Sequence, residues 1–220
     1  MSWSSGKDSA FALHEARQRG EVDIVGLLTT TTEAHNRVAM HGVRNDLLEK
    51  QAAALGLPLL KVPLPTPCSN AEYEARMAAA CAGLKSQGVD HIVFGDLYLE
   101  DVRAYRVQRL SAIGMTAQFP LWKRDTKILA QQMIASGLVA YITCLDPRRL
   151  ARSFAGRRFD AHFLSDLPGD VDPCGENGEF HTVVTAGPMF RAAIPVSIGE
   201  TIEREGFVFT DVAAIEATSG

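Results

Sequence analysis

The sequence predicts an α/β protein, with a parallel sheet in the first half of the chain and a smaller α+β domain after it. In the first half, short runs rich in β-branched residues alternate with longer segments whose apolar residues recur at helical spacing. A glycine (Gly20, Gly56, Gly88 or Gly114) ends each of the first four helical segments, as helix C-terminal caps do. Beyond Trp122 this alternation gives way to strands separated by long loops rich in Gly, Pro and Asp.

Each element follows from its own pattern. We expect strands at residues 23–29, 59–62 and 91–95 and around 119–122, and helices at 9–18, 43–55, 71–87, 102–113 and 126–135. Further strands are expected at 139–145, 180–185 and 207–212. We place the domain boundary after Trp122, which gives domains 1–122 and 123–220.

Composition bounds the class of protein. Of the 220 residues, 46% are hydrophobic and 22% are charged, which is close to the globular average and excludes a disordered, fibrous or coiled-coil chain. The 22 basic and 26 acidic residues give a net charge of -4, so nucleic acid is not the expected general partner. No apolar stretch approaches the roughly 20 residues of a membrane span, and no signal segment opens the chain, so we expect a cytoplasmic protein. We expect all four cysteines to be free thiols.

The first candidate site is the run Ser4, Ser5, Gly6, Lys7, Asp8, Ser9, which leads directly into a helix. Small residues let the backbone amides converge on an anion, the helix N-terminus adds partial positive charge and the lysine a full one, so the run fits a pyrophosphate cradle. It is not a Walker A motif, and its residues alone also allow a simple helix cap. Since only residues 1–3 precede it, the strand it follows is either unusually short or lacks its beginning.

This run resembles the loop of the PP-loop ATP pyrophosphatases, which cleave ATP between the α and β phosphates. Four more segments narrow the resemblance to the diphthine–ammonia ligase family, in what looks like its bacterial branch. They are Met40-His41-Gly42-Val43, Phe94-Gly95-Asp96, Phe119-Pro120-Leu121-Trp122 and, most specific of all, Asp172-Pro173-Cys174-Gly175-Glu176-Asn177-Gly178-Glu179-Phe180-His181-Thr182. The resemblance covers residues 2 to about 191.

The resemblance implies a Rossmann-like sheet of the HUP class with helices on both faces, and a C-terminal domain that holds the substrate. It also implies an ATP-dependent ligase that adenylates the diphthine carboxylate of elongation factor 2 and transfers it to ammonia, releasing AMP and pyrophosphate. Gln108 and Ser111 stand where eukaryotic and archaeal members have Glu and Cys. The acceptor carboxylate therefore stays open, one on a protein included, as does a homodimer. No glutaminase triad is evident, so ammonia would come from solution or from a partner.

In this family the loop of residues 4–9 would hold ATP, with Lys7 on the phosphates. Asp8 and Asp96 are the candidate Mg²⁺ ligands, because Mg²⁺ prefers one or two carboxylates together with phosphates and water. Gly95 and Asp96 follow a strand at the edge where α/β sheets bind ligands, although Asp96 alone also fits a turn or helix cap.

Three further residues are weaker candidates for the nucleotide site. His41 would line the adenosine pocket, or else lie on the surface. Arg103 and Arg106 are three apart on one helix face and fit the phosphates, or pairing with Glu100 or Asp101 instead.

The second candidate site is the acidic loop of residues 172–182. Gly175 and Gly178 permit tight turns, so Glu176, Glu179 and His181 are expected to converge on one point facing the ATP site. The acids would bind a cationic trimethylammonium group or ammonium, and His181 would handle a proton. A metal site with Cys174, and a purely structural loop, are the alternatives.

Other functions remain open from the residues. One alternative is a PP-loop enzyme that keeps the loop but acts on another acceptor, either a tRNA base or a small carboxylic acid, as in corrinoid salvage. Another is a sensor that binds a nucleotide without turnover. One basic run would suit an anionic partner, but we favour a helix paired with Asp146, Asp160 and Asp166. That run consists of Arg148, Arg149, Arg152, Arg157 and Arg158.

Overall fold

Parallel strands form the sheet of the first half in the computed structural model, which describes residues 1–32, 37–38 and 42–215. β1 (Leu27–Thr32) pairs in parallel with β3 (Leu59–Leu64), and β4 (His91–Val93) pairs in parallel with β5 (Thr116–Gln118). The two residues of β2 (Arg37–Val38) run antiparallel to the end of β1.

Residues 1–3 join these strands into one sheet. Ser2 forms a parallel bridge with Leu28 of β1, and its amide donates a 2.9 Å hydrogen bond to the carbonyl of Val93 in β4. The spatial order is therefore β3, β1, residues 1–3, β4, β5. This is the doubly wound order, in which the chain winds outward in opposite directions from its first strand.

Helices cover both faces of this sheet. α1 (Lys7–Arg19) and α2 (Asn45–Leu55) contribute to the larger of two hydrophobic clusters. α3 (Asn70–Ser86) and α4 (Glu100–Ser111) belong to the smaller cluster, which lies against Leu28 and Ile92. The predicted α/β class with helices on both faces is confirmed.

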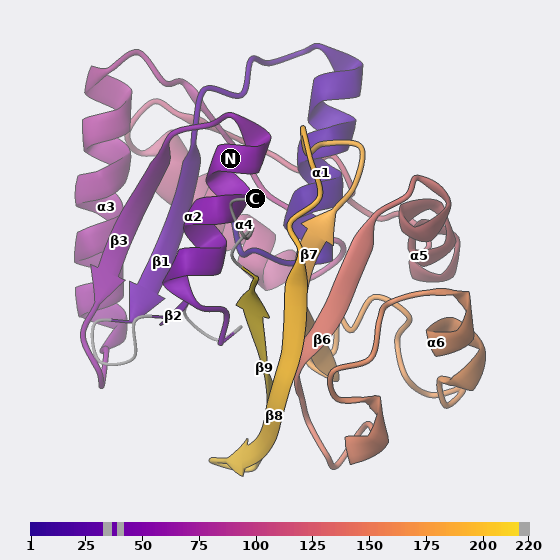
Figure 1. Cartoon of the computed structure of the whole chain (residues 1–220). Helices are drawn as coiled ribbons and strands as arrows, with labels where there is room; N and C mark the ends of the chain where they lie inside the picture. The colour runs from indigo at the N-terminus through magenta and orange to yellow at the C-terminus, as the bar shows by residue number, and fades with distance from the viewer. Residues whose placement is uncertain (33–36, 39–41, 216–220) are drawn as a thin grey trace, which may run out of the picture.

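An antiparallel sheet dominates the second half, to the right of the parallel strands in Figure 1. Its strands are β6 (Val139–Leu145), β7 (Phe180–Ala186), β8 (Val196–Arg204) and β9 (Phe207–Ala214), in the order β7-β6-β9-β8. α5 (Thr126–Ala135) and α6 (Ala161–Asp166) lie on its outer side, and a single 3-10 turn spans Arg152–Phe154. This matches the expected α+β character of the second half.

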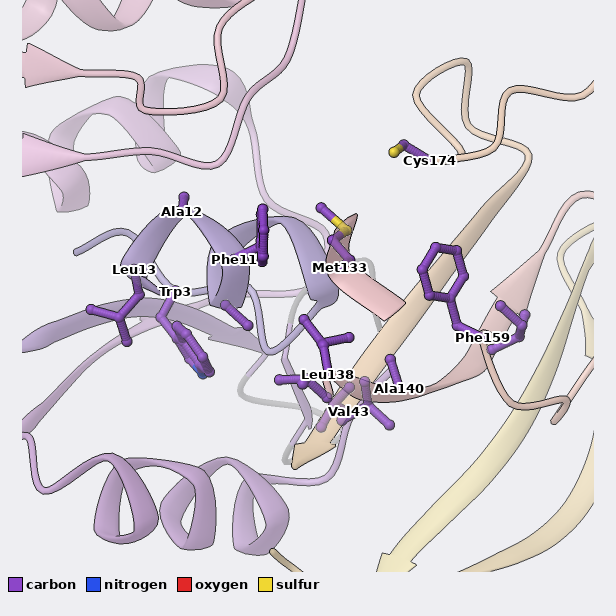
Figure 2. Close-up of a cluster of buried hydrophobic side chains, with 14 of the residues drawn as sticks. Trp3, Phe11, Ala12, Leu13, Val43, Met133, Leu138, Ala140, Phe159 and Cys174 are labelled. Carbon is purple, nitrogen blue, oxygen red and sulfur yellow. The ribbon is translucent and has the colours of Figure 1, made fainter. Parts of the chain in front are cut away.

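The larger core runs through both halves. Figure 2 shows Trp3 and Phe11, from the first strand and helix, in the same cluster as Met133, Ala140 and Phe159 of the second half. The antiparallel sheet therefore shares one hydrophobic core with α1 and α2, which β7 and β9 contact. The boundary that we place after residue 122 stays a prediction.

Several expected elements need correction. The strand expected around residues 119–122 is wrong, because those residues form a turn after β5 ends at Gln118. The first expected strand begins at Leu27 instead of residue 23, and the one expected at 91–95 ends at Val93. The sequence pattern missed β8, an edge strand that is mostly exposed and so lacks apolar alternation, and the one-and-a-half-turn α6.

The basic run is also not the expected helix. Arg148 pairs with Asp146 at 2.8 Å and Arg157 pairs with Asp166 at 2.7 Å, as predicted. Asp160, however, caps α6 by accepting a hydrogen bond from the amide of Phe163 at 2.9 Å.

Other expectations are confirmed. All four cysteines are free, and the four glycines expected after helices adopt positive φ angles. Within the described parts of the chain, no helix has the length and apolar character needed to cross a membrane.

Candidate functional site

The candidate site lies where the sheet changes direction. Residues 1–3 and β4 are neighbours whose connections leave toward opposite edges of the sheet, and such a crevice at the carboxyl ends of the strands is where doubly wound sheets bind ligands. Residues 4–9, here called the N-terminal loop, follow the first of these strands, and Gly95 and Asp96 follow the second. A cavity of about 680 Å³ opens between them and the acidic loop.

The N-terminal loop is held by its own serines. Ser4 and Ser9 place their hydroxyl oxygens 3.1 Å apart, and the Ser9 hydroxyl donates to the carbonyl of Gly6 at 3.0 Å. Gly6 directly precedes α1, so the first turn of that helix faces the cavity. Every residue of the loop lines the cavity except Ser5, which is fully buried.

Gly95 is required by a close backbone approach. A Cβ atom at this position would lie 2.7 Å from the amide nitrogen of Ser9 and 2.8 Å from the carbonyl carbon of Asp8. Any side chain would therefore push β4 away from the start of α1. The absence of a side chain brings Asp96 beside the N-terminal loop.

The second half of the chain clamps the N-terminal loop in place. The amide of Lys7 donates to the hydroxyl of Thr182 at 3.0 Å, and the amide of Val184 donates to the carbonyl of Ser5 at 2.9 Å. The side chain of Gln51 donates to the carbonyls of Ser5 (3.1 Å) and Val184 (2.7 Å), and accepts from the indole of Trp3 at 2.9 Å. Backbone and side-chain hydrogen bonds therefore join the loop to β7.

Lys7 is buried, with 2% of its side chain exposed, and its ammonium group bridges the two loops. It contacts both carboxylate oxygens of Asp8 at 2.9 Å and donates to the carbonyl of Cys174 in the acidic loop. The rings of Phe159 and Phe180 lie 5.7 and 5.4 Å away. Burial is the largest single effect and lowers the pKa of Lys7, but the charge of Asp8, the hydrogen bond to it and the other acidic groups nearby together outweigh burial, and the pKa is raised.

Asp96 is paired with Arg106. The two side chains approach to 3.0 Å, and the guanidinium of Arg106 lies 4.3 Å from the ring centroid of Phe94. The pKa of Asp96 is nevertheless raised, chiefly because the carboxyl group is buried, and the nearby charge of Asp8 adds to the effect. Two carboxylates thus share one electrostatic environment at the cavity wall.

These two carboxylates fit a magnesium ion bound together with a nucleotide. Asp8 and Asp96 line the same cavity, and a divalent cation would relieve the repulsion from Asp8, which adds to the effect of burial on the pKa of Asp96. Among the described residues, no three His, Cys, Asp or Glu side chains form a metal-binding group by themselves. The phosphates of a nucleotide would have to supply the remaining ligands.

The acidic loop does not bring all three expected residues together. Glu176 and His181 line the cavity, but the carboxylate of Glu179 turns inward and is 1% exposed. It accepts hydrogen bonds from the amides of Asp172 (3.0 Å) and Asn177 (2.9 Å) and from the Asn177 side chain (3.0 Å). Glu179 therefore organises the loop, and the expected convergence holds only for the other two.

Glu176 is half-buried among other acids. Burial, and then the charge of Asp8, raise its pKa to about 8, against the opposing effect of Lys7. Glu179 has the opposite shift, because its hydrogen bonds outweigh its burial and lower its pKa. The pKa values of the two glutamates are therefore shifted in opposite directions, upward for Glu176 and downward for Glu179.

The remaining expected residues have different positions. Arg103 packs over the rings of Phe119 and Trp122, with 5.4 and 5.0 Å to the centroids, and does not line the cavity. His41 lies outside the described residues. Sequence reasoning did not place Arg149 here, yet this residue lines the cavity. In the sequence, Arg149 is one of the five arginines of the basic run, and that pattern does not distinguish it from the other four.

Comparison with known proteins gives consistent matches. One family model, described as the N-terminal domain of diphthamide synthase, matches residues 1–116, and another, described as its C-terminal domain, matches residues 125–218. The diphthine–ammonia ligase of Danio rerio is 26% identical over 238 residues, covering 98% of this chain and 92% of that protein. Those of Bos taurus and Mus musculus are 25% and 24% identical, each covering 96% of this chain and 86% of the relative.

Proposed function

The chain belongs to the diphthamide synthase family, and from that premise we propose that it is an ATP-dependent ligase that adenylates a diphthine-like carboxylate and transfers it to ammonia. The observation that carries the proposal is that the N-terminal loop and the acidic loop line a single cavity at the switch point of the sheet. One wall is suited to nucleotide phosphates, and the other offers polar groups for an acceptor.

The reaction needs two displacements. In the first, an oxygen of the acceptor carboxylate bonds to the α-phosphorus of ATP, and pyrophosphate leaves. In the second, ammonia attacks the carbonyl carbon of the adenylate, and AMP leaves with one of the original carboxylate oxygens. Activation is required because hydroxide is too poor a leaving group for direct amide formation.

The N-terminal loop would bind the departing pyrophosphate. Backbone amides at the start of α1 and the ammonium of Lys7 supply positive charge where negative charge builds up. Asp8 and Asp96 would hold Mg²⁺, which neutralises further charge on the phosphates. Arg106, paired with Asp96, would orient that carboxylate.

The acidic loop would bind the acceptor and ammonia. Glu176 lines the cavity, and a cationic trimethylammonium or ammonium group beside it would favour its ionised form. His181, the second residue of strand β7, would take a proton from the attacking nitrogen. Neither role requires Glu179.

The test is product formation. The protein is incubated with ATP, MgCl₂, ammonium chloride and a diphthine-containing peptide, and AMP, pyrophosphate and amidated peptide are measured. We expect the three products in equal amounts. Formation of ADP and phosphate would contradict adenylation. AMP formed with a small carboxylic acid or tRNA, but not with the peptide, would overturn the acceptor. No turnover with any acceptor would leave a nucleotide sensor.

Two variants sharpen this test. Glu176→Gln should abolish acceptor-dependent AMP formation while the affinity for ATP stays within about twofold, a difference of less than half a kcal/mol. The matched control is Glu21→Gln, on an exposed residue after α1, which should keep full activity. A Glu176→Gln variant that turns over at the parent rate would remove this glutamate from the acceptor site.

A further inference from the structure

Three basic side chains line the cavity, and only one of them has no ion pair or side-chain hydrogen bond among the described residues. Lys7 is held by Asp8, and Arg106 is held by Asp96. Arg149 is exposed, and its side chain makes no hydrogen bond or ion pair within the described parts of the chain. Asp146 interacts with Arg149 through charge alone, with no ion pair or hydrogen bond between the two side chains, so the guanidinium donors of Arg149 are available to a ligand that enters the cavity.

The position of Arg149 is fixed by the turn that carries it. The amide of Asp146 donates to the carbonyl of Glu179 at 3.0 Å, which ties this turn to the acidic loop. The amide of Leu150, a residue that is 1% exposed, donates to the carbonyl of Asp146 at 2.9 Å. The turn is thus anchored on both sides of residue 149.

The preceding arginine is drawn elsewhere. The buried carboxylate of Asp146 accepts three hydrogen bonds from Arg148, from its amide at 2.9 Å and from Nε and Nη2 at 2.8 Å each. The hydrogen bonds of Arg148 to Asp146 stabilise the turn, and Arg148 does not line the cavity, whereas Arg149 does. Two adjacent arginines therefore have different environments.

The charges in the cavity explain why an unpaired arginine is needed there. A carboxylate acceptor must approach the anionic α-phosphate of ATP in a cavity that already contains the carboxyl groups of Asp8 and Asp96. Coulomb repulsion opposes that approach unless a cation meets the carboxylate. An arginine suits this task because its planar guanidinium donates two parallel hydrogen bonds to a carboxylate.

We propose that Arg149 binds the carboxylate of the acceptor and aims it at the α-phosphate. This assignment rests on the proposed ligase function and adds to it the group that recognises the acceptor's anionic end. Arg149 lies on the turn that the amide of Asp146 ties to Glu179 of the acidic loop. It therefore belongs to the acceptor's side of the cavity.

Binding and turnover together test the assignment. Parent protein, Arg149→Gln and Arg158→Gln are titrated with a non-hydrolysable ATP analogue, with a diphthine-containing peptide and with the same peptide carrying diphthamide, which lacks the carboxylate. Arg158 is the matched control because it is an exposed arginine of the same run that does not line the cavity. AMP formation is followed in the same three proteins.

We expect Arg149→Gln to bind the diphthine peptide at least about tenfold more weakly, the effect of losing a charge-assisted pair, with unchanged affinity for the ATP analogue. Its KM for the peptide should rise similarly, and the preference for diphthine over diphthamide should disappear. Arg158→Gln should match the parent.

Several results would overturn the assignment. Weaker binding of the ATP analogue by Arg149→Gln would move this arginine to the phosphates, and unchanged peptide binding would remove it from the site. If the parent does not bind the diphthine peptide, the proposal of a diphthine acceptor and the role proposed for Arg149 are both refuted. If the parent binds the peptide through Arg149 but forms no AMP, the ligase proposal fails while the carboxylate site stands. If AMP forms and the peptide KM of Arg149→Gln equals that of the parent, the ligase proposal stands and the carboxylate site at Arg149 fails.

Discussion

Replacing Lys7 with methionine separates the structural and functional roles of this side chain. The ammonium group contacts the carboxylate of Asp8 and the carbonyl of Cys174, while the aliphatic stem lies near the rings of Phe159 and Phe180. Methionine keeps the length and apolar stem of lysine but removes its charge and hydrogen-bond donors. Lys7→Met therefore tests the ammonium group without opening a large cavity.

The cost in folding stability should be modest. The pair with Asp8 contributes about 1 kcal/mol or less, because that carboxylate is a quarter exposed and can regain water. The lost bond to the Cys174 carbonyl costs about 1.5–3 kcal/mol. Removing a buried charge returns part of this, since burying an ammonium costs several kcal/mol. We expect a net loss of about 2 kcal/mol, or roughly 4–8 °C in Tm for a chain of this size.

The loss in nucleotide affinity should be larger than the stability change can explain. If the ammonium group meets the phosphates, its removal weakens ATP binding by at least tenfold, or about 1.4 kcal/mol. Titration calorimetry with ATP and MgCl₂, run at a temperature where the variant is fully folded, measures this directly. Lys127→Met, on an exposed position of α5, is the matched control and should bind ATP like the parent. A Lys7→Met variant with a lower Tm but unchanged ATP affinity would show that Lys7 only joins the two loops.

Three other variants test the frame of the site. Gln51→Ala removes three buried hydrogen bonds, so we expect its free energy of unfolding, measured by chemical denaturation, to fall by about 3–5 kcal/mol. The control Gln108→Ala, at an exposed position, should lose almost none. Equal stability of the two variants would disprove the clamp. Glu179→Gln places an amide against buried N–H donors and should cost about 2 kcal/mol, so a parent-like melting curve would contradict its role in organising the loop. Because the pKa of Glu176 is raised to about 8, ionisation of this residue opposes folding. In EDTA the Tm of the parent should therefore fall relative to that of Glu176→Gln as the pH rises from about 5 to about 8. A constant Tm difference over this range would show that this pKa is not raised.

Patterns that depend on local chemistry were sufficient to predict much of the fold. Residues close in sequence specify the N-terminal loop, the helix after it and the glycine caps, so the positions of these features can be predicted from short stretches of sequence. Strand β6 was predicted with its observed bounds because it is buried and rich in apolar residues. Edge strand β8 could not be recognised, since its exposure removes the apolar alternation that marks a strand.

The direction of a side chain depends on contacts that are distant in sequence. Glu176 and Glu179 are three residues apart and chemically identical, yet one lines the cavity and the other is bound by the backbone of its own loop. Arg148 and Arg149 differ only because Asp146 captures the first of them. Sequence spacing placed the two glutamates in the region of the site but did not place Arg149 there, and it could not separate the roles of the two members of either pair.

The central claim is that the acceptor carboxylate is adenylated in the cavity between the two loops, and oxygen transfer tests it most directly. A diphthine peptide labelled with ¹⁸O at both carboxylate oxygens is incubated with the protein, ATP, MgCl₂ and ammonium chloride, and the products are examined by mass spectrometry. Adenylation requires one ¹⁸O atom to appear in each AMP formed, with none in pyrophosphate. Label in phosphate or pyrophosphate, or AMP formed without label, would contradict the account.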